Sequence, residues 1–485
     1  MIQNIAQKKL YFIILLILLF FKNNVFDFNY YKNQYNNFKD NNIIEKNKNI
    51  KVAYYLTSIK FGGIARTITL LINYLSKINI FEHYLIIKSK KLKGEYIIPK
   101  KTKRISLFEK NITLFDVLEQ EKIDILIYNF FNNDEIEKLN ALNSTQVIYY
   151  NHSSFLLWIY KYIFNYQKSI YYAYKKSKYV LSLIPLENFY LFEKWGIKSI
   201  LINNLATVLF KNYENIDNDE YQSMKIDEFI ILNKRYYYEL FIWKSITYNI
   251  DLIVPSNLDT KNIIMVGRAY DPIKRYDLGI KAMKYIVNEI PDSKMYIISN
   301  IYQKYIELIK NLNLEKNVFF SGFTKNPEIF YKNASLHIMP SLSETYPMAL
   351  SEAKIFGIPT ILCGLDYLAL AKGGTVIIYD DNPHTIAIEA IKILKNYEYR
   401  KMLGKQAREN MKKHKNQLII KKWVKILLSV YKRDNKIYTI TESEQDEKIS
   451  ENEAKKILNN QLKLLKKRIP FFKNISYNKF KYIFK

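Results

Sequence analysis

Short apolar segments alternate with segments of helical periodicity along most of this 485-residue chain. The run Lys51–Ser58 has the length and apolar content of a buried strand. The segment after it, residues 64–77, repeats apolar side chains at helical spacing on one face. Strands that alternate with helices form parallel sheets, because each helix carries the chain back to the edge where the next strand starts. The alternation therefore predicts an α/β fold.

The same alternation runs through both halves of the chain. In the first half it predicts strands over residues 51–58, 83–89, 123–129, 145–152, 178–185 and 197–204, with a helix over 64–77. In the second half it predicts strands over residues 262–267, 294–299, 317–322, 335–340 and 360–363, with helices over 277–290, 302–312 and 347–356. We therefore expect two Rossmann-like domains that face each other across a cleft. The cleft is the expected ligand site, because parallel sheets bind ligands at the carboxyl ends of their strands.

Composition excludes several other classes of protein. Hydrophobic residues make up 49% of the chain, which excludes a disordered protein, and the 12 glycines and 11 prolines are too few for a collagen-like or linker-like one. Cys363 is the single cysteine, so the sequence allows neither an internal disulfide nor a cysteine-based zinc or iron–sulfur site.

The charge balance predicts attraction to polyanions. The chain has 74 Lys and Arg residues against 46 Asp and Glu residues, a formal net charge of +28. Asparagine, lysine, isoleucine and tyrosine are used heavily from end to end, so the excess of lysine follows a bias of the whole chain. Because the sequence contains no nucleic-acid recognition module, we do not expect nucleic acid as a partner, and a polyanion-binding protein is the third of three functional hypotheses.

An unbroken apolar run of 12 residues, Leu10–Phe21, follows Lys8 and Lys9. As a helix it spans about 18 Å, which is shorter than the ~30 Å core of a bilayer and matches the apolar region of a signal peptide. The sequence after it lacks the small residues of a cleavage site, so we expect a short, uncleaved membrane anchor rather than a buried core helix. Lysines on both sides leave its orientation open.

Gly62 and Gly63 stand directly after the first predicted strand, where the first helix begins. Glycine there lets a phosphate or a sugar approach the N–H groups of a helix start, although an ordinary strand-to-helix turn explains the pair equally well. The chain has no G-x-G-x-x-G and no G-x-x-x-x-G-K-[ST], so dinucleotide-binding and P-loop sites lack their signatures, and we expect no cofactor.

Two basic residues and two carboxylates follow strands of the second half. Arg268 and Lys274 lie six positions apart after its first strand, where they could clamp a diphosphate; a solvated basic loop is the alternative. Glu344 precedes the helix that Pro347 starts, and Glu352 lies within that helix. Both could accept hydrogen bonds from sugar hydroxyls beside the positive helix end. The alternatives are a capping role for Glu344 and a solvent-facing position for Glu352.

His152 ends a predicted strand in a small polar turn, Asn151–Ser154. A histidine at the carboxyl end of a parallel strand is placed to meet a ligand, although a lone histidine is more often structural. Asn151 also begins the glycosylation motif Asn-His-Ser. A glycan would obstruct a site there, which favours a catalytic part on the cytosolic side of the membrane.

These motifs together resemble the retaining GT-B glycosyltransferases of family 4, the glycosyl transferases group 1 domain. The matching segments are VGRAYDPIKRYDLGIKA, NVFFSGF and MPSLSETYPMALSEAKIFGIPTIL, and the last resembles the E-x7-E element of the family, with Glu344 and Glu352. The resemblance is strong over Lys261–Tyr431. It is weaker over the first half, where the glycine pair and the histidine match by position.

The resemblance implies a binding site for a nucleoside-diphosphate sugar. Arg268 and Lys274 would bind the diphosphate and stabilise the leaving nucleotide. Glu344 would contact the transferred sugar and Glu352 the ribose hydroxyls, while His152 would face the sugar and the reaction centre. The implied catalytic residues are His152, Glu344, Arg268 and Lys274. The implied donor-binding residues are Gly62, Gly63, Arg268, Lys274, Glu344, Tyr346, Met348, Ala349 and Glu352.

The resemblance also implies transfer without a metal ion and with retention of anomeric configuration. The chain departs from the family pattern in three places: Thr345 stands where members have a glycine or another small residue, the segment Cys363–Asp380 is more apolar, and residues 205–259 contain an insertion. These departures leave the base and the sugar open.

The tail after the acidic segment Glu442–Glu453 has an amphipathic pattern. One helical face carries Ala454, Ile457, Leu458, Gln461, Leu465 and Ile469, and lysines surround it. Such a helix either lies at a membrane interface or packs against the catalytic body.

We therefore expect a membrane-associated, retaining, hexosyltransferase-type enzyme that moves a sugar from a nucleoside-diphosphate sugar to a glycan or lipid-linked acceptor. The alternative is a non-catalytic GT-B scaffold that binds nucleotide or glycan. The expected parts are a membrane anchor with a polar stem (1–48), an acceptor domain (49–204), a connection with an insertion (205–259), a donor domain (260–410), a closing helix (411–434) and an acidic linker with a basic tail (435–485).

Overall fold

The computed structural model describes residues 49–60, 62–130, 132–152, 172–206, 254–322, 324, 327–414, 416–434 and 449–468. The predicted membrane anchor and the greater part of both the predicted insertion and the acidic linker lie outside these residues. Of the helices that are described, none is long and apolar enough to span a bilayer.

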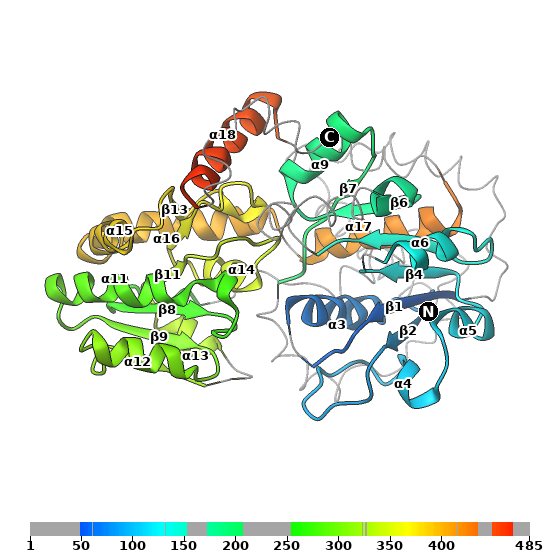
Figure 1. Cartoon of the computed structure of the whole chain (residues 1–485), viewed down its shortest axis with the longest axis horizontal. Coiled ribbons are helices and arrows are strands. Elements are labelled where there is room, and N and C mark those ends of the chain that lie inside the picture. Colours follow the sequence, from blue (N-terminus) through cyan, green and yellow to red (C-terminus); the bar gives the residue numbers. More distant parts are fainter. Residues whose placement is uncertain are drawn as a thin grey trace, which may run out of the picture. The chain divides into compact units, whose positions relative to one another are not determined.

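The first half builds a parallel sheet of seven strands in the order β3-β2-β1-β4-β5-β6-β7 (Figure 1). The strands are β1 Ile50–Leu56, β2 Phe81–Ile87, β3 Lys103–Ser106, β4 Ile125–Tyr128, β5 Gln146–Tyr150, β6 Tyr179–Ser182 and β7 Ile200–Leu201. All except β3 lie where the apolar runs predict a strand. The apolar pattern misses β3 because this edge strand, with the sequence KRIS, contains a single apolar side chain.

The helices described in this half are α3 Gly63–Leu75, α4 Leu107–Lys110, α5 Leu114–Gln120, α6 Asn133–Asn140 and α9 Pro185–Trp195. In α3 the side chains of Ile68, Leu71 and Leu75 are buried, as their spacing predicts. Strand β1 is buried along nearly its whole length, as a central strand of a parallel sheet must be when both faces are covered.

The second half builds a parallel sheet of six strands in the order β10-β9-β8-β11-β12-β13. The strands are β8 Asn262–Val266, β9 Lys294–Ile298, β10 Val318–Phe320, β11 Leu336–Met339, β12 Thr360–Cys363 and β13 Thr375–Ile378. The helices are α11 Tyr276–Glu289, α12 Gln303–Asn311, α13 Glu328–Lys332, α14 Met348–Ile355, α15 Pro383–Lys395 and α16 Tyr397–Lys412, with 3₁₀ turns η4 Pro272–Lys274 and η5 Ala369–Ala371. The prediction omits β13, which lies in the unusually apolar segment.

Helix α17 (Asn416–Tyr431) returns from the second half to the first sheet. The side chain of Asn416 donates a hydrogen bond to the Ala206 carbonyl and another to the Tyr74 hydroxyl. The Trp423 ring is 1% exposed and meets the Tyr150 ring edge to face, with centroids 5.3 Å apart. Helix α17 therefore packs on the first half of the chain.

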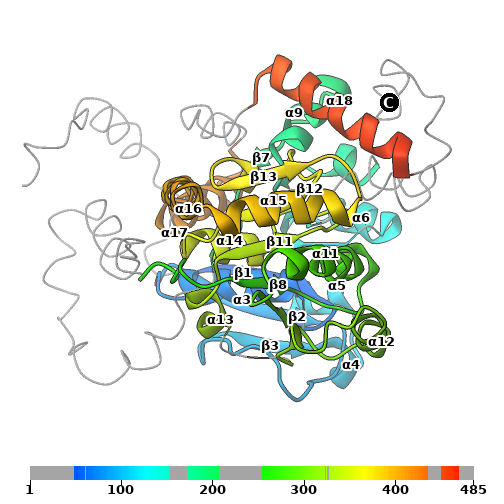
Figure 2. The same cartoon turned by 90° about the vertical axis from the view of Figure 1, so that its left-hand side faces the viewer.

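Helix α18 (Glu451–Arg468) lies next to β13 in both views (Figure 2). Its Leu458 and Leu465 are fully buried, and Gln461 donates a 2.8 Å hydrogen bond to the Gly364 carbonyl. Leu464 fills the space where a Cβ on Gly364 would lie. Of the two alternatives for the tail, the structure therefore has the apolar face of the helix packed against the protein. The partner of its apolar face is the apolar segment around β12 and β13.

This packing predicts a stability effect. Leu465→Ala removes a fully buried side chain from α18, so we expect the free energy of unfolding to fall by about 2–5 kcal/mol in urea unfolding. Lys463→Ala, at an exposed position of the same helix, is the control and should change it by less than about 0.5 kcal/mol. Equal, small effects of both variants would contradict the packing of α18.

Candidate functional site

The predicted site residues follow the carboxyl ends of strands in both sheets. Arg268 and Lys274 follow β8, Glu344 follows β11, and His152 follows β5. The glycine pair follows β1 and begins α3. Because β8 and β11 are neighbours in the second sheet, the loops after them lie side by side.

Lys274 and Glu344 form an ion pair between these two loops. Lys274 Nζ lies 2.5 Å from Glu344 Oε1, and the two side chains are 22% and 11% exposed. Gly267 lies against the lysine stem, since a Cβ there would be in van der Waals contact with Lys274 Cε at 3.6 Å and closer, at 3.2 Å, to the Tyr276 hydroxyl. The backbone N–H of Leu342 donates to the Ile273 carbonyl at 2.7 Å and joins the loops a second time. Lys274 is therefore not part of a solvated loop, and Glu344 is not a helix cap.

Arg268 lies beside the glycine turn of the first half. A Cβ built on Gly62 would be 3.8 Å from Arg268 Nη1, and Gly62 has a φ of +100°, which favours glycine. The guanidinium is 49% exposed and forms a 2.8 Å ion pair with Asp271. Gly63 is exposed at the first position of α3. The two halves of the chain therefore meet at a cation that one half provides and a turn that the other provides.

Glu352 is buried, with 1% of the residue exposed. One carboxylate oxygen forms a 2.8 Å ion pair with Arg66 of α3, and the other accepts a 2.8 Å hydrogen bond from the Tyr331 hydroxyl. The solvent-facing alternative for Glu352 is therefore wrong. The sequence analysis missed Arg66; its one signal is a position three residues after Gly63, in the first turn of the helix.

The His152 backbone is joined to the loop that contains Glu344. Thr345 Oγ1 donates a 2.8 Å hydrogen bond to the His152 carbonyl, so the threonine that departs from the family pattern connects the two halves. The imidazole packs on Tyr150 with ring centroids 4.1 Å apart. Burial lowers the pKa of His152 to about 3, so the ring is neutral at physiological pH. Among the described residues, nothing hydrogen-bonds its Nε2.

The remaining predicted donor-binding residues have mixed environments. Met348 begins α14 and its sulfur lies 3.9 Å from the Thr67 hydroxyl of α3. Ala349 is half-buried in the same turn, which no side chain caps among the described residues. Tyr346 is a buried member of the hydrophobic core, with its ring 6.3 Å from that of His414. No group of three or more acidic, histidine or cysteine side chains that could hold a metal occurs in the part of the chain that is described.

A second set of charged residues connects the loop that contains Lys274 to helix α18. Asp381 forms ion pairs with Arg275, the neighbour of Lys274, and with Arg468 of the tail helix, at 2.6 and 2.8 Å. Arg275 has a left-handed backbone, with φ of +51°. The sequence offered no signal for this cluster, because its three members come from distant segments.

The carboxyl group of Glu187 is buried next to Asn151, the residue before His152. The Tyr174 hydroxyl donates to Glu187 Oε1 at 2.6 Å, and the Asn151 amide approaches the same oxygen at 3.4 Å. Burial raises the pKa of Glu187 to about 8. The carboxyl group is therefore protonated at neutral pH, beside the residue that precedes His152.

This proton links stability to pH. Between pH 4.5 and 8, folded Glu187 holds a proton that the unfolded chain releases, so the free energy of unfolding falls as pH rises, by up to about 1.4 kcal/mol per unit. Glu187→Gln keeps the shape of the neutral carboxyl group and cannot lose a proton. In urea unfolding, the free energy of unfolding of the variant relative to that of the wild type should therefore rise progressively across that range. Exposed Glu307→Gln is the control. A difference between Glu187→Gln and wild type that does not change with pH would contradict the assignment.

Residues 250–410 match the model of the family "Glycosyl transferases group 1". The poly(ribitol-phosphate) alpha-N-acetylglucosaminyltransferase of Staphylococcus aureus is 26% identical over 183 residues, which are 36% of this chain and 37% of the relative. The poly(glycerol-phosphate) alpha-glucosyltransferase of Bacillus subtilis is 27% identical over 151 residues, which are 30% of this chain and 22% of that relative. The chain thus spans little more than a third of the first relative and less than a quarter of the second.

Solved structures share the fold at low sequence identity. Sucrose-phosphate synthase from Thermosynechococcus elongatus has a TM-score of 0.59 at 15% identity, with 79% of this chain and 100% of that chain covered. TarM from S. aureus, in complex with fondaparinux, alpha-GlcNAc-glycerol and UDP, has a TM-score of 0.58 at 13% identity with the same coverage. The chain therefore shares the two-sheet GT-B fold of these structures, and residues 250–410 match the glycosyl transferases group 1 model.

Proposed function

We propose that the protein is a retaining glycosyltransferase that moves a sugar from a nucleoside-diphosphate sugar to a glycan or lipid-linked acceptor. The observation that carries the proposal is the Lys274–Glu344 ion pair, between the loops after two neighbouring strands and beside Arg268. A cation and a carboxylate at the carboxyl edge of a parallel sheet suit a ligand that has phosphates at one end and hydroxyls at the other.

Donor binding separates this ion pair. The diphosphate replaces Glu344 as the partner of Lys274 and draws on Arg268 as a second cation. The released carboxylate then accepts hydrogen bonds from hydroxyls of the transferred sugar. Because both cations are in place before the reaction, they stabilise the negative charge that develops on the leaving nucleoside diphosphate.

Glu352 binds the ribose in this proposal. Its two oxygens accept hydrogen bonds from Arg66 and Tyr331 in the ligand-free protein, and ribose hydroxyls are donors of the same kind. If a ribose hydroxyl replaces Arg66 as the partner of Glu352, the Arg66 side chain, which belongs to the first half of the chain, is free to face the donor phosphates. The glycine turn before α3 leaves the helix start open to the same phosphates.

Transfer occurs at one face of the sugar. The acceptor oxygen forms a bond to the anomeric carbon as the bond to the leaving phosphate breaks, and the hydroxyl proton passes to that phosphate. In this proposal the neutral His152 ring hydrogen-bonds a hydroxyl of the sugar without adding charge. The cations supply the stabilisation that a metal ion gives in other enzymes, so we propose that transfer is metal-independent.

The acceptor and the cellular location are further parts of the proposal. The two relatives are named for transfer to polyol-phosphate polymers, which supports a glycan acceptor. The apolar run Leu10–Phe21 supports attachment to a membrane, and the glycosylation motif at Asn151 favours a catalytic part on the cytosolic side. UDP-sugars are the first donors to test, because several structures with this fold contain UDP.

The first test is nucleotide release from UDP-, GDP- and ADP-sugars by the full chain without added metal. We expect one donor to be hydrolysed, and Lys274→Ala and Glu344→Ala each to lower the rate about a hundredfold to a thousandfold, because each removes a group that acts in the transition state. Lys304→Ala and Glu307→Ala, at exposed positions of α12, are the matched controls and should leave the rate unchanged. A folded protein that binds a donor and releases no nucleotide, even with acceptor present, would favour the scaffold alternative.

A second test concerns nucleotide affinity. Glu352→Gln replaces a charged acceptor by a neutral one, so binding of the nucleoside diphosphate should weaken about tenfold, measured by calorimetry. Glu307→Gln should bind as the wild type does. Unchanged affinity in folded Glu352→Gln would remove the ribose role.

A further inference from the structure

The segment between β2 and β3, residues 88–102, is strongly basic. It has the sequence KSKKLKGEYIIPKKT, with six lysines and one glutamate, and it forms no helix or strand. We refer to residues 88–102 as the basic loop. Within it, Lys90, Lys91, Lys93, Lys100 and Lys101 are exposed.

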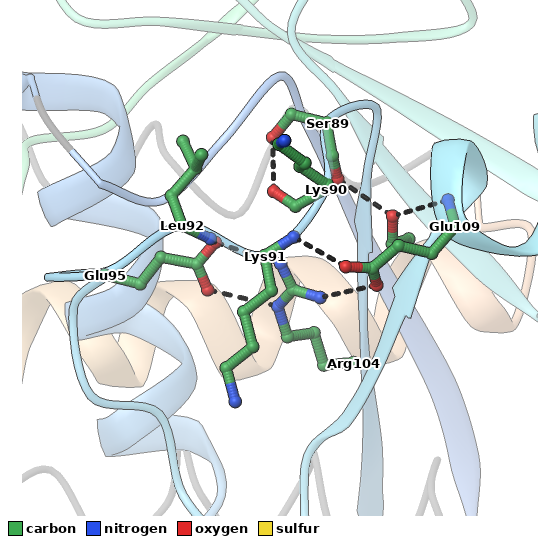
Figure 3. Close-up of polar contacts among 8 residues, drawn as sticks. Ser89, Lys90, Lys91, Leu92, Glu95, Arg104 and Glu109 are labelled. Carbon is green, nitrogen blue, oxygen red and sulfur yellow. Dashed lines mark hydrogen bonds and ion pairs between the residues drawn. The ribbon is translucent and has the colours of Figure 1, made fainter.

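The basic loop is held in one shape by groups that face inward (Figure 3). Arg104 of β3 binds Glu95 with two hydrogen bonds of 3.2 and 2.9 Å, and these side chains are 16% and 8% exposed. Glu95 also accepts the backbone N–H of Leu92 at 3.0 Å, and Glu109 accepts that of Lys91 at 2.8 Å. The acidic side chains of Glu95 and Glu109 therefore bind the loop backbone and Arg104. They do not neutralise the lysines, and the Lys91 side chain extends away from the cluster (Figure 3).

Hydrogen bonds fix the basic loop beside the turn that follows β1. Ser89 donates its backbone N–H to the Thr57 carbonyl at 3.1 Å, and Tyr96 donates to the Ile59 carbonyl at 3.0 Å. Gly94 approaches Lys60, with its Cβ position 3.9 Å from Lys60 Cε. The same turn continues into Gly62, which lies beside Arg268. The basic loop is therefore fixed beside the turn after β1, at the edge of the first sheet where the candidate site lies.

The arrangement suits an anion with repeated charges. Separate, exposed ammonium groups can each bind one of the successive negative charges of a polymer. A small anion, by contrast, needs several donors that converge on one point. A membrane surface fits less well, because Ile97 is the only large hydrophobic residue of the loop that is strongly exposed, and interfacial binding needs a larger apolar area.

We propose that the basic loop binds a polymeric acceptor with repeating phosphodiester groups and presents one of its units to the donor site. This inference rests on the proposed function and names its acceptor class. Because the loop backbone is fixed before binding, association does not have to order it, and the charges also attract the polymer from a distance.

Binding of linear poly(glycerol phosphate) to the full chain tests the proposal. The variant Lys90→Gln/Lys91→Gln/Lys93→Gln should bind the polymer about tenfold more weakly, since each exposed contact contributes modestly, and the binding should depend less on salt. The control Lys304→Gln/Lys310→Gln/Lys316→Gln removes the same charge from exposed positions of the second half and should bind as the wild type does. Donor hydrolysis should be unchanged in both variants.

The outcomes separate this inference from the proposed function. Equal weakening in both variants means that net charge alone binds the polymer, and it overturns the proposal. So does equal binding of a neutral dextran of the same length, or a loop-dependent affinity for anionic vesicles in place of the polymer. A wild-type protein that hydrolyses no donor sugar argues against the proposed function. Polymer binding by the basic loop is measured without donor turnover, so its result tests this inference separately.

Discussion

All strand pairings in the two sheets are parallel, and this constraint places the candidate site. Parallel strands end at one edge, so residues that follow them meet there even when they are distant in sequence. Lys274 follows β8 and Glu344 follows the neighbouring β11, and their ion pair joins positions 70 residues apart. The glycine turn after β1 meets the same region from the other half of the chain.

Ion pairing governs the ligand-free site. Lys274 is held by Glu344, Arg268 by Asp271, and Arg66 by Glu352. A partly buried charge without a partner is costly, so these pairs keep the cations in place in the ligand-free protein. In the function proposed above, donor binding exchanges these partners, which favours an anionic donor that also has hydroxyl groups for the released carboxylates.

Periodicity predicted most of the strands because buried parallel strands are continuous apolar runs. It missed β3, whose edge position leaves it polar, and β13, where apolar residues serve as a surface for α18 as well as a strand. Spacing also identified Glu352 but not its burial, which depends on Arg66 and Tyr331 from other elements. A single position in sequence does not show which distant group compensates its charge.

The sequence by itself determined the α/β class, the order of most strands, and the residues that end strands at the candidate site, because these follow from local periodicity and motif spacing. The tertiary structure alone decided the partners. It paired Lys274 with Glu344, connected Thr345 to the His152 backbone and packed α18 on the second sheet. Those contacts join residues far apart in the chain, and only the packed fold brings their atoms within bonding distance.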